Sequence, residues 1–163
     1  MYGPDCRELE SRIAEISSAK YAIGCASGSE ALLVALMAHD IGPGDEVILP
    51  SFTFFATASA VWRLGAKVVF ADIDPSTFNM DAKHVESLVN SNTRAIIPVH
   101  LFGQCADMDL LGKLADQHGL LVIEDAAQSI GAKFNGKACG AIGHVGCFSS
   151  VSYTHLTLPT TLS

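Results

Sequence analysis

Short apolar runs alternate with segments of helical periodicity along most of this 163-residue chain, and this alternation strongly limits its possible folds. The runs are continuously apolar, as expected for strands whose sheet is covered by helices on both faces. The pattern predicts an α/β fold built on a mostly parallel sheet with helices on both faces. Strands are expected at 21–25, 46–49, 67–71, 95–99 and 120–123, and helices at 9–16, 29–39, 53–64, 81–89 and 107–118.

Composition and charge exclude several classes of protein. Hydrophobic residues make up 49% and charged residues 17% of the chain, which excludes disorder. The formal net charge is −7, but Lys and Arg do not cluster, so neither nucleic acid nor an anionic membrane surface is indicated. The apolar run 52–62 is too short to span a bilayer and predicts a buried helix. The polar start is unlike a signal peptide, and we expect a cytoplasmic protein with no membrane partner.

The cysteines give no sign of a disulfide framework. They are odd in number and scattered, and no two of them form a C-x-x-C pair. We therefore expect reduced thiols and no bound metal. The five are Cys6, Cys25, Cys105, Cys139 and Cys147.

A small-residue turn separates the expected strand 21–25 from the next helix. Gly28 permits a tight turn, and the N–H groups at the helix start can bind a phosphate, to which Ser29 adds a hydroxyl. Ordinary helix capping by Ser27 or Ser29, with Glu30 in the first turn, explains the same residues. The chain has neither G-x-G-x-x-G nor G-K-[ST], so a dinucleotide or Walker-type site is not indicated.

The expected strand 120–123 ends in two carboxylates, Glu124 and Asp125, and Gln128 follows three residues later. Ligands of open α/β sheets bind beyond the carboxyl ends of the strands. A carboxylate there can pair with the protonated ring nitrogen of a pyridine-type cofactor. Capping of the next turn by Asp125 is the alternative.

Two other strand ends carry candidate residues. Phe54 follows the strand 46–49 and could stack on a flat cofactor, although core packing is the usual role of Phe. His100 follows the strand 95–99 and could face the same site, but a structural role is favoured for a single histidine.

Six stretches of the chain, in order, resemble the DegT/StrS-type (DegT/DnrJ/EryC/StrS) family of pyridoxal-phosphate-dependent sugar aminotransferases. Together they cover nearly all of residues 9–149 and are far more specific than any single motif. The resemblance implies that residues 1–149 form an incomplete, cofactor-binding large domain of a fold-type I transferase, without the small C-terminal domain. The stretches are CASGSEALLVAL, IGPGDEVILPSFTFFATA, GAKVVFADIDPSTFNMD, RAIIPVHLFGQCADMD, HGLLVIEDAAQSIGA and GHVGCFS.

The resemblance also implies a role for each candidate residue. One group would bind the cofactor phosphate, and a second group would hold the pyridine ring. Asp125 and Gln128 would act in catalysis. The implied phosphate ligands are Gly28, Ser29, the Glu30 amide and Ser149; the implied ring contacts are Phe54 by stacking, Asp125 at the ring nitrogen and Gln128 at the phenolate oxygen.

One group that the family's chemistry requires is missing. In the family, the lysine that forms the Schiff base follows the Ser of the F-S motif by five residues. Counted from Ser149, that position is Thr154, and no lysine follows Lys137. A hydroxyl cannot form the required imine. Because residues 150–163 carry no charge and no helical period, we expect a truncated reading frame with a foreign, poorly packed tail.

The resemblance implies a parent enzyme that works as a homodimer. It would transfer an amino group from an amino acid, glutamate, to a keto-sugar nucleotide in surface-polysaccharide or amino-sugar biosynthesis. The stretches HLFGQCADMD and GCFS are similar to those of enzymes that aminate 3-keto sugar acids. This chain itself is expected to be inactive. The alternative is a non-catalytic pseudo-enzyme, or a binding or regulatory module of the same fold.

Overall fold

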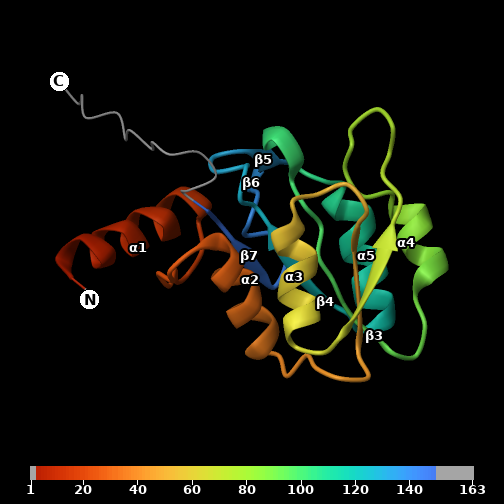
Figure 1. Cartoon of the computed structure of the whole chain (residues 1–163). Coiled ribbons are helices and arrows are strands. Elements are labelled where there is room, and N and C mark those ends of the chain that lie inside the picture. The colour runs from red at the N-terminus through yellow and green to blue at the C-terminus, as the bar shows by residue number, and fades with distance from the viewer. Residues whose placement is uncertain (1–2, 150–163) are drawn as a thin grey trace.

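A five-stranded parallel sheet forms the centre of the protein in a computed structural model that describes residues 3–149 (Figure 1). The strand order is β2-β1-β3-β4-β7, and each neighbouring pair is parallel. The predicted α/β fold is therefore confirmed. The strands are β1 (Glu46–Pro50), β2 (Lys67–Ala71), β3 (Thr93–Ile96), β4 (Leu121–Asp125) and β7 (Val145–Cys147), with a separate antiparallel pair, β5 (Lys133–Phe134) and β6 (Lys137–Ala138).

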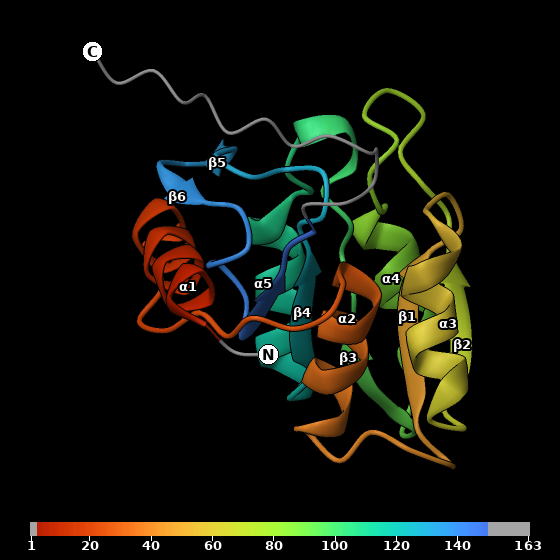
Figure 2. The same cartoon turned by 60° about the vertical axis from the view of Figure 1, so that its left-hand side comes forward.

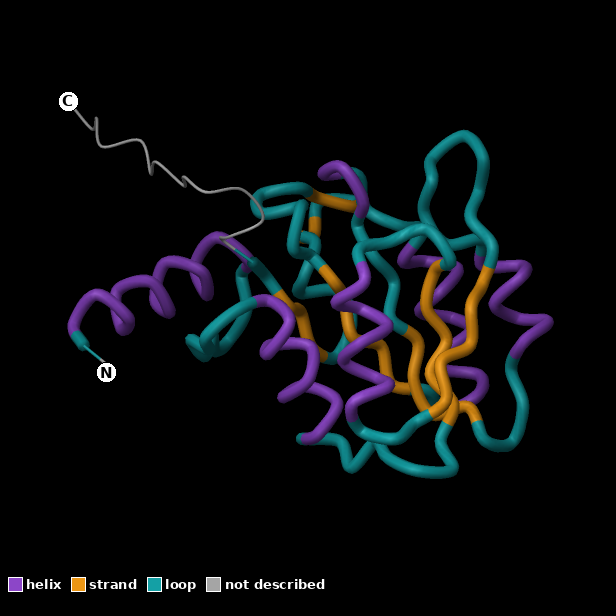
Figure 3. The backbone as a smooth tube through the Cα atoms, viewed as in Figure 1, coloured by secondary structure: helices purple, strands orange, loops and turns teal. Residues whose placement is uncertain are grey.

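Helices cover both faces of the sheet, as the apolar strands predicted (Figures 1 and 3). α2 and α3 pack on one face, and α4 and α5 on the other. α1 lies at the β7 side and projects away from the sheet (Figure 2). Within residues 3–149, no helix is long and apolar enough to cross a membrane. The bounds are α1 (Pro4–Ser17), α2 (Gly28–Met37), α3 (Phe55–Arg63), α4 (Ala82–Leu88), α5 (Met108–His118) and a 3₁₀ turn, η1 (Leu101–Gly103).

The two layers of the core follow from the alternation of side chains along each strand. Val47 and Leu49 of β1 pack in the cluster with α2 and α3, whereas Ile48 packs in the cluster with α4 and α5. In β4, Ile123 faces the first layer and Val122 the second. Because β1 and β4 are buried along nearly their whole length, their sequences read as continuous apolar runs, whereas the edge strand β2 is only half-buried and its Phe70 is 54% exposed.

The predicted strand at 21–25 is wrong. This segment is irregular, and the side chains of Tyr21 and Ile23 are 74% and 87% exposed. Its Gly24 N–H donates to Glu10 Oε1 at 2.7 Å, a contact with α1 and not with a strand. Apolar residues form a strand only where they pair with a neighbouring strand, and among the described residues this segment pairs with none.

Three other elements differ from expectation in smaller ways. The helix expected at 53–64 is not fully buried, because Thr57 and Val61 face the core while Trp62 is exposed. The regular strand pairing in the segment expected at 95–99 ends at Ile96, because Pro98 has no N–H to donate. Strand β7 was not predicted, because three residues are too few to show a period.

Gly146 in β7 offers a test of this packing. A Cβ at this position would overlap the backbone carbonyl of Gly140, and backbone cannot move aside as a flexible side chain can. We expect Gly146→Ala to lower the free energy of unfolding by about 3 kcal/mol or more, measured by urea denaturation. The matched control is Gly112→Ala in α5, where nothing lies within 4 Å of the new methyl group. That change should raise helix stability by up to about 1 kcal/mol; equal effects of the two changes would contradict the described packing of β7.

Candidate functional site

The predicted site residues gather at the carboxyl edge of the sheet. The chain passes from β1 to β2 on one side and then to β3 on the other, so the connections diverge beside β1. Such a point leaves a crevice beyond the strand ends, where ligands bind in open α/β sheets. Phe54 follows β1, Asp125 ends β4, and Ser149 follows β7.

Asp125 is held in one orientation by two donors. Thr57 of α3 donates its hydroxyl to Oδ2 at 2.7 Å, and the Ala127 N–H donates to Oδ1 at 3.3 Å. The residue is only 6% exposed, and burial raises the pKa of its carboxyl although both hydrogen bonds oppose that rise. A turn and not a helix follows β4, and Asp125 Oδ1 caps this turn through the Ala127 N–H, as the capping alternative predicted.

Phe54 is the residue just before α3, and its side chain faces solvent. Its carbonyl accepts the Thr57 N–H at 3.2 Å, so Thr57 bonds to the Phe54 backbone and to the Asp125 carboxylate. The Phe54 side chain is 75% exposed, which contradicts the usual core role of phenylalanine. An exposed aromatic ring is a surface that a flat ligand can cover.

The start of α2 is in contact with Ser149. A Cβ on Gly28 would lie 2.7 Å from Ser149 Cβ and 3.1 Å from its Oγ, so only glycine fits here. The β4–β7 register pairs Asp125 with Cys147, two residues before Ser149. The structure thus brings the two predicted phosphate-binding segments together and places them near the end of β4.

The start of α2 is capped by Ser27, as the capping alternative predicted. Ser27 Oγ accepts the Glu30 N–H at 3.2 Å, and the Ser27 carbonyl accepts the Ala31 N–H. The Glu30 amide N–H, assigned above to the cofactor phosphate, is therefore already bonded to the Ser27 side chain. The Glu30 carboxylate forms an ion pair with Arg63, with an N–O distance of 3.0 Å. In this turn, Gly28 and Ser29 come before Ala31, whose N–H makes the first backbone hydrogen bond of the helix.

Gln128 lies in the turn after β4, next to η1. Its Oε1 accepts the Phe102 N–H at 2.9 Å, which orients the amide and leaves its N–H groups as donors. A phenolate oxygen needs a hydrogen-bond donor, so this orientation of the Gln128 amide is consistent with its predicted contact to the phenolate oxygen.

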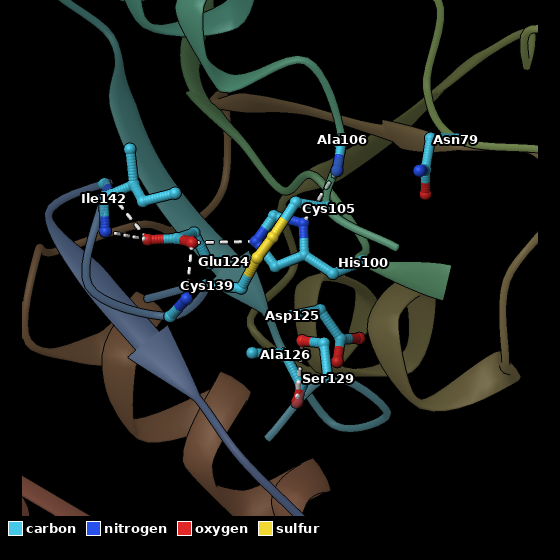
Figure 4. A network of polar contacts seen from close by, with 12 residues as sticks. Asn79, His100, Cys105, Ala106, Glu124, Asp125, Ala126, Ser129, Cys139 and Ile142 are labelled. Carbon is cyan, nitrogen blue, oxygen red and sulfur yellow. Dashed lines mark hydrogen bonds and ion pairs between the residues drawn. A yellow bond between two sulfur atoms is a disulfide. The ribbon is translucent and has the colours of Figure 1, made fainter. Parts of the chain in front are cut away.

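Glu124, to which the sequence assigned no role, is the centre of a fully buried network (Figure 4). Its oxygens accept from the backbone N–H groups of the turn at 140–143 and from His100. Burial alone would raise the pKa of Glu124, but these hydrogen bonds outweigh burial and hold it below its ordinary value. The donors are His100 Nε2 at 2.7 Å, Gly140 N at 2.6 Å, Ile142 N at 2.7 Å and Gly143 N at 2.6 Å.

His100 has a structural role, as favoured above. The Ala106 N–H donates to Nδ1 at 3.1 Å, so Nδ1 carries no proton and Nε2–H is the donor to Glu124. The ring is completely buried and both nitrogens are engaged. His100 therefore does not face the site.

The expectation that all thiols are reduced is wrong for one pair. Cys105 and Cys139 form a disulfide, with Cα atoms 6.2 Å apart. The sequence separation of 34 hides this proximity, which arises because the residues that follow Cys105 and Cys139 both bond to the His100–Glu124 pair at the end of β4. Cys147 is free and buried, and burial raises the pKa of its thiol to about 12.

The position expected for the lysine, Thr154, and the whole segment 150–163 lie outside the described residues. The structure therefore does not bear on the origin of this tail, which stays a prediction.

Comparison with known proteins decides the family. The model of the DegT/DnrJ/EryC1/StrS aminotransferase family matches residues 1–159. The chain belongs to this family. A UDP-2-acetamido-2-deoxy-3-oxo-D-glucuronate aminotransferase of Pseudomonas aeruginosa is 51% identical over 147 residues, which are 90% of this chain and 41% of that protein. A pleiotropic regulatory protein of Geobacillus stearothermophilus is 56% identical over 90% of this chain and 40% of its own length. The chain spans about 40% of the length of the curated relatives it matches.

Solved structures of the aminotransferase family share this fold. An aminotransferase from Psychrobacter cryohalolentis is 45% identical and superposes with a TM-score of 0.88, over 90% of this chain and 37% of that one. The PLP form of a Streptococcus pneumoniae protein, 30% identical, gives a TM-score of 0.86 over 90% of this chain and 41% of that one. The described chain therefore corresponds to part of a fold-type I aminotransferase.

The Glu124 network predicts a pH-dependent stability. Glu124→Gln replaces one accepting oxygen by an NH₂ group that meets buried donors, so we expect a loss of about 3 kcal/mol in unfolding free energy at pH 7. Because the folded-state pKa of Glu124 is lowered, its contribution is complete above the ordinary value of 4.5 and is lost as pH falls through the folded value. The difference between wild type and variant should therefore be largest above pH 4.5 and shrink as pH falls below it.

Urea denaturation at pH 7 and near pH 4 measures this difference. The control is Glu86→Gln, an exposed position on α4. A difference for Glu124→Gln that stays constant across this pH range would contradict an ionised, hydrogen-bonded Glu124.

Proposed function

We propose that this chain supplies the cofactor-binding part of a pyridoxal-phosphate-dependent aminotransferase that acts on a keto-sugar nucleotide. The complete enzyme takes its amino group from an amino acid, glutamate, and works in the cytoplasm as a homodimer in surface-polysaccharide or amino-sugar biosynthesis. Residues 1–149 form the partial large domain, and a small C-terminal domain completes the parent enzyme.

The placement of Asp125 carries this proposal. When bound, pyridoxal phosphate supplies an electron sink, provided that its ring nitrogen stays protonated. A buried carboxylate oriented by Thr57 can hold that proton on the ring nitrogen, because an opposite charge relieves the cost of burying the acid. Phe54, at the start of the helix that carries Thr57, has an exposed ring that can cover one face of the pyridine ring.

The other end of the site suits the cofactor phosphate. Gly28 leaves room where α2 approaches Ser149, and the hydroxyls of Ser29 and Ser149 can donate to phosphate oxygens at the positive end of the helix. Gln128 keeps its amide N–H groups as donors for the phenolate oxygen. The residues present therefore offer suitable groups for the phosphate, the ring nitrogen and the phenolate oxygen.

The names of the relatives support the substrate class. Curated relatives include aminotransferases for UDP-linked and dTDP-linked sugars and a GDP-perosamine synthase, at 42% to 51% identity. Because the nucleotide differs among them, the shared substrate class is the nucleotide-linked sugar and not one base. The Pseudomonas aeruginosa relative acts on a 3-oxo sugar acid, in agreement with the HLFGQCADMD stretch.

We further propose that this chain by itself does not catalyse transamination. Thr154 stands where the family's lysine is expected, and a hydroxyl cannot link covalently to the cofactor's aldehyde. The pleiotropic regulatory protein at 56% identity favours a second candidate, a regulatory module of the same fold. In both cases residues 28–149 keep the cofactor-binding surface, and covalent attachment distinguishes an enzyme from a module.

Binding of pyridoxal phosphate tests the role of Asp125. We expect saturable binding by the unmodified chain, followed by cofactor absorption and induced circular dichroism. Asp125→Asn should weaken the affinity for pyridoxal phosphate by about 10- to 100-fold, the loss expected for one charged hydrogen bond. The matched control is Asp116→Asn, an exposed acid on α5, which should leave the affinity unchanged. Equal affinities of the Asp125 and Asp116 variants, or no saturable binding by the unmodified chain, would contradict the proposal.

Covalent attachment tests the missing lysine. We expect that borohydride reduction in the presence of pyridoxal phosphate labels no single lysine stoichiometrically, as mapped by mass spectrometry. The chain's lysines are Lys20, Lys67, Lys83, Lys113, Lys133 and Lys137, all before the F-S motif. Stoichiometric labelling of one of them, with turnover of a keto-sugar nucleotide, would show that this chain is itself an enzyme.

A further inference from the structure

The two disulfide-bonded cysteines lie next to the residues that hold the Glu124–His100 pair. Cys105 precedes Ala106, whose N–H donates to His100 Nδ1. Cys139 precedes Gly140, whose N–H donates to Glu124 Oε2. The same Oε2 accepts from His100 Nε2, so each cysteine flanks one end of this hydrogen-bonded pair (Figure 4).

The disulfide therefore closes a ring of covalent and hydrogen bonds. The ring runs from Cys105 through Ala106, His100, Glu124 and Gly140 to Cys139. Without the S–S bond, the segment after η1 and the segment after β6 are connected at this point only by hydrogen bonds. Oxidation thus adds a covalent clamp around the carboxylate that precedes Asp125.

The two thiols differ in their access to solvent. Cys139 is 1% exposed, whereas Cys105 is half-buried and lines a hollow of about 420 Å³ with Phe102 and Lys133. None of the residues that line this hollow is among the proposed cofactor ligands. A small oxidant can therefore reach Cys105 through this hollow.

We propose that Cys105 and Cys139 are a reversible oxidation site, whose oxidant is a low-molecular-weight disulfide such as oxidised glutathione. The Cys105 thiolate attacks one sulfur of the oxidant, which forms a mixed disulfide and releases one thiolate. The Cys139 thiolate then attacks Cys105 Sγ and releases the second. Two cysteine thiols lose two electrons and two protons, and the oxidant becomes two thiols.

His100 does not turn this pair into a metal site. Ligand atoms of His100, Cys105 and Cys139 lie within 4.8 Å of one another, a spacing that a metal ion could use. Both ring nitrogens, however, already hold hydrogen bonds, and releasing Nε2 would leave the buried Glu124 with one donor fewer. In a reducing compartment, the disulfides that do form in proteins are usually transient pairs with a catalytic or redox-sensing role.

Thiol counting and peptide mapping test the site directly. In the full chain, incubated with oxidised glutathione and then denatured, Cys105 and Cys139 should be linked to each other, while Cys6, Cys25 and Cys147 carry a free thiol or one glutathione each. After treatment with dithiothreitol the chain should expose all five thiols. Digestion without reduction should yield one linked peptide pair that contains Cys105 and Cys139. A different pairing, or five reactive thiols after oxidation, would overturn the proposal.

Thermal unfolding tests the clamp. For a closed loop of this length, Tm of the oxidised chain should exceed that of the reduced chain by roughly 5–15 °C. Cys105→Ser should abolish this redox dependence, and the matched control Cys6→Ser in α1 should retain it. The wild-type comparison needs no variant, so a misfolded variant does not remove the test. Equal Tm values in both redox states, or one zinc ion retained by the reduced chain with both thiols protected, would overturn the proposal.

This inference goes beyond the proposed function and does not rest on it. Neither thiol mapping nor thermal unfolding involves pyridoxal phosphate, so the cofactor assignment and the oxidation site can fail separately.

Discussion

The buried carboxylate of Glu124 organises the carboxyl edge of the sheet. A buried carboxylate is costly unless its oxygens accept several hydrogen bonds, so its donors must stay in place for the chain to remain folded. Those donors come from His100 after β3 and from the turn at 140–143 before β7. One ion thus fixes three segments that are distant in sequence, and the neighbouring residue, Asp125, takes its position from them.

Two adjacent acids have opposite environments because a strand alternates its side chains between the two faces of the sheet. Glu124 points toward His100 and the 140–143 turn, where hydrogen bonds lower its pKa. Asp125 points toward Thr57 of α3, where burial dominates and raises its pKa. Glu124 accepts four hydrogen bonds from the protein, whereas Asp125 accepts two, one on each oxygen. An acid with fewer protein donors has lone pairs left to receive a charged ligand.

Much of the fold and part of the site could be predicted from sequence. The strands that became β1 and β4 were found because burial on both faces makes each a continuous apolar run, and β2 was found by its apolar composition although it is a half-buried edge strand. The segment 21–25 has a similar composition but pairs with no strand among residues 3–149, and its apolar pattern carries no information about pairing. Asp125 was found because it follows such a run, whereas its orientation by Thr57, 68 residues away, has no signal in the local pattern.

By itself, the sequence determined the α/β architecture, the family and the strand ends that carry Phe54, Asp125 and Ser149. These depend on local periodicity and on matched stretches in order, which can be read along the chain. Only the tertiary structure decided that Ser27 takes the Glu30 amide, that His100 serves Glu124, and that Cys105 meets Cys139. Each of these depends on which groups become buried together, and burial is a property of the packed layers and not of neighbouring residues in the chain.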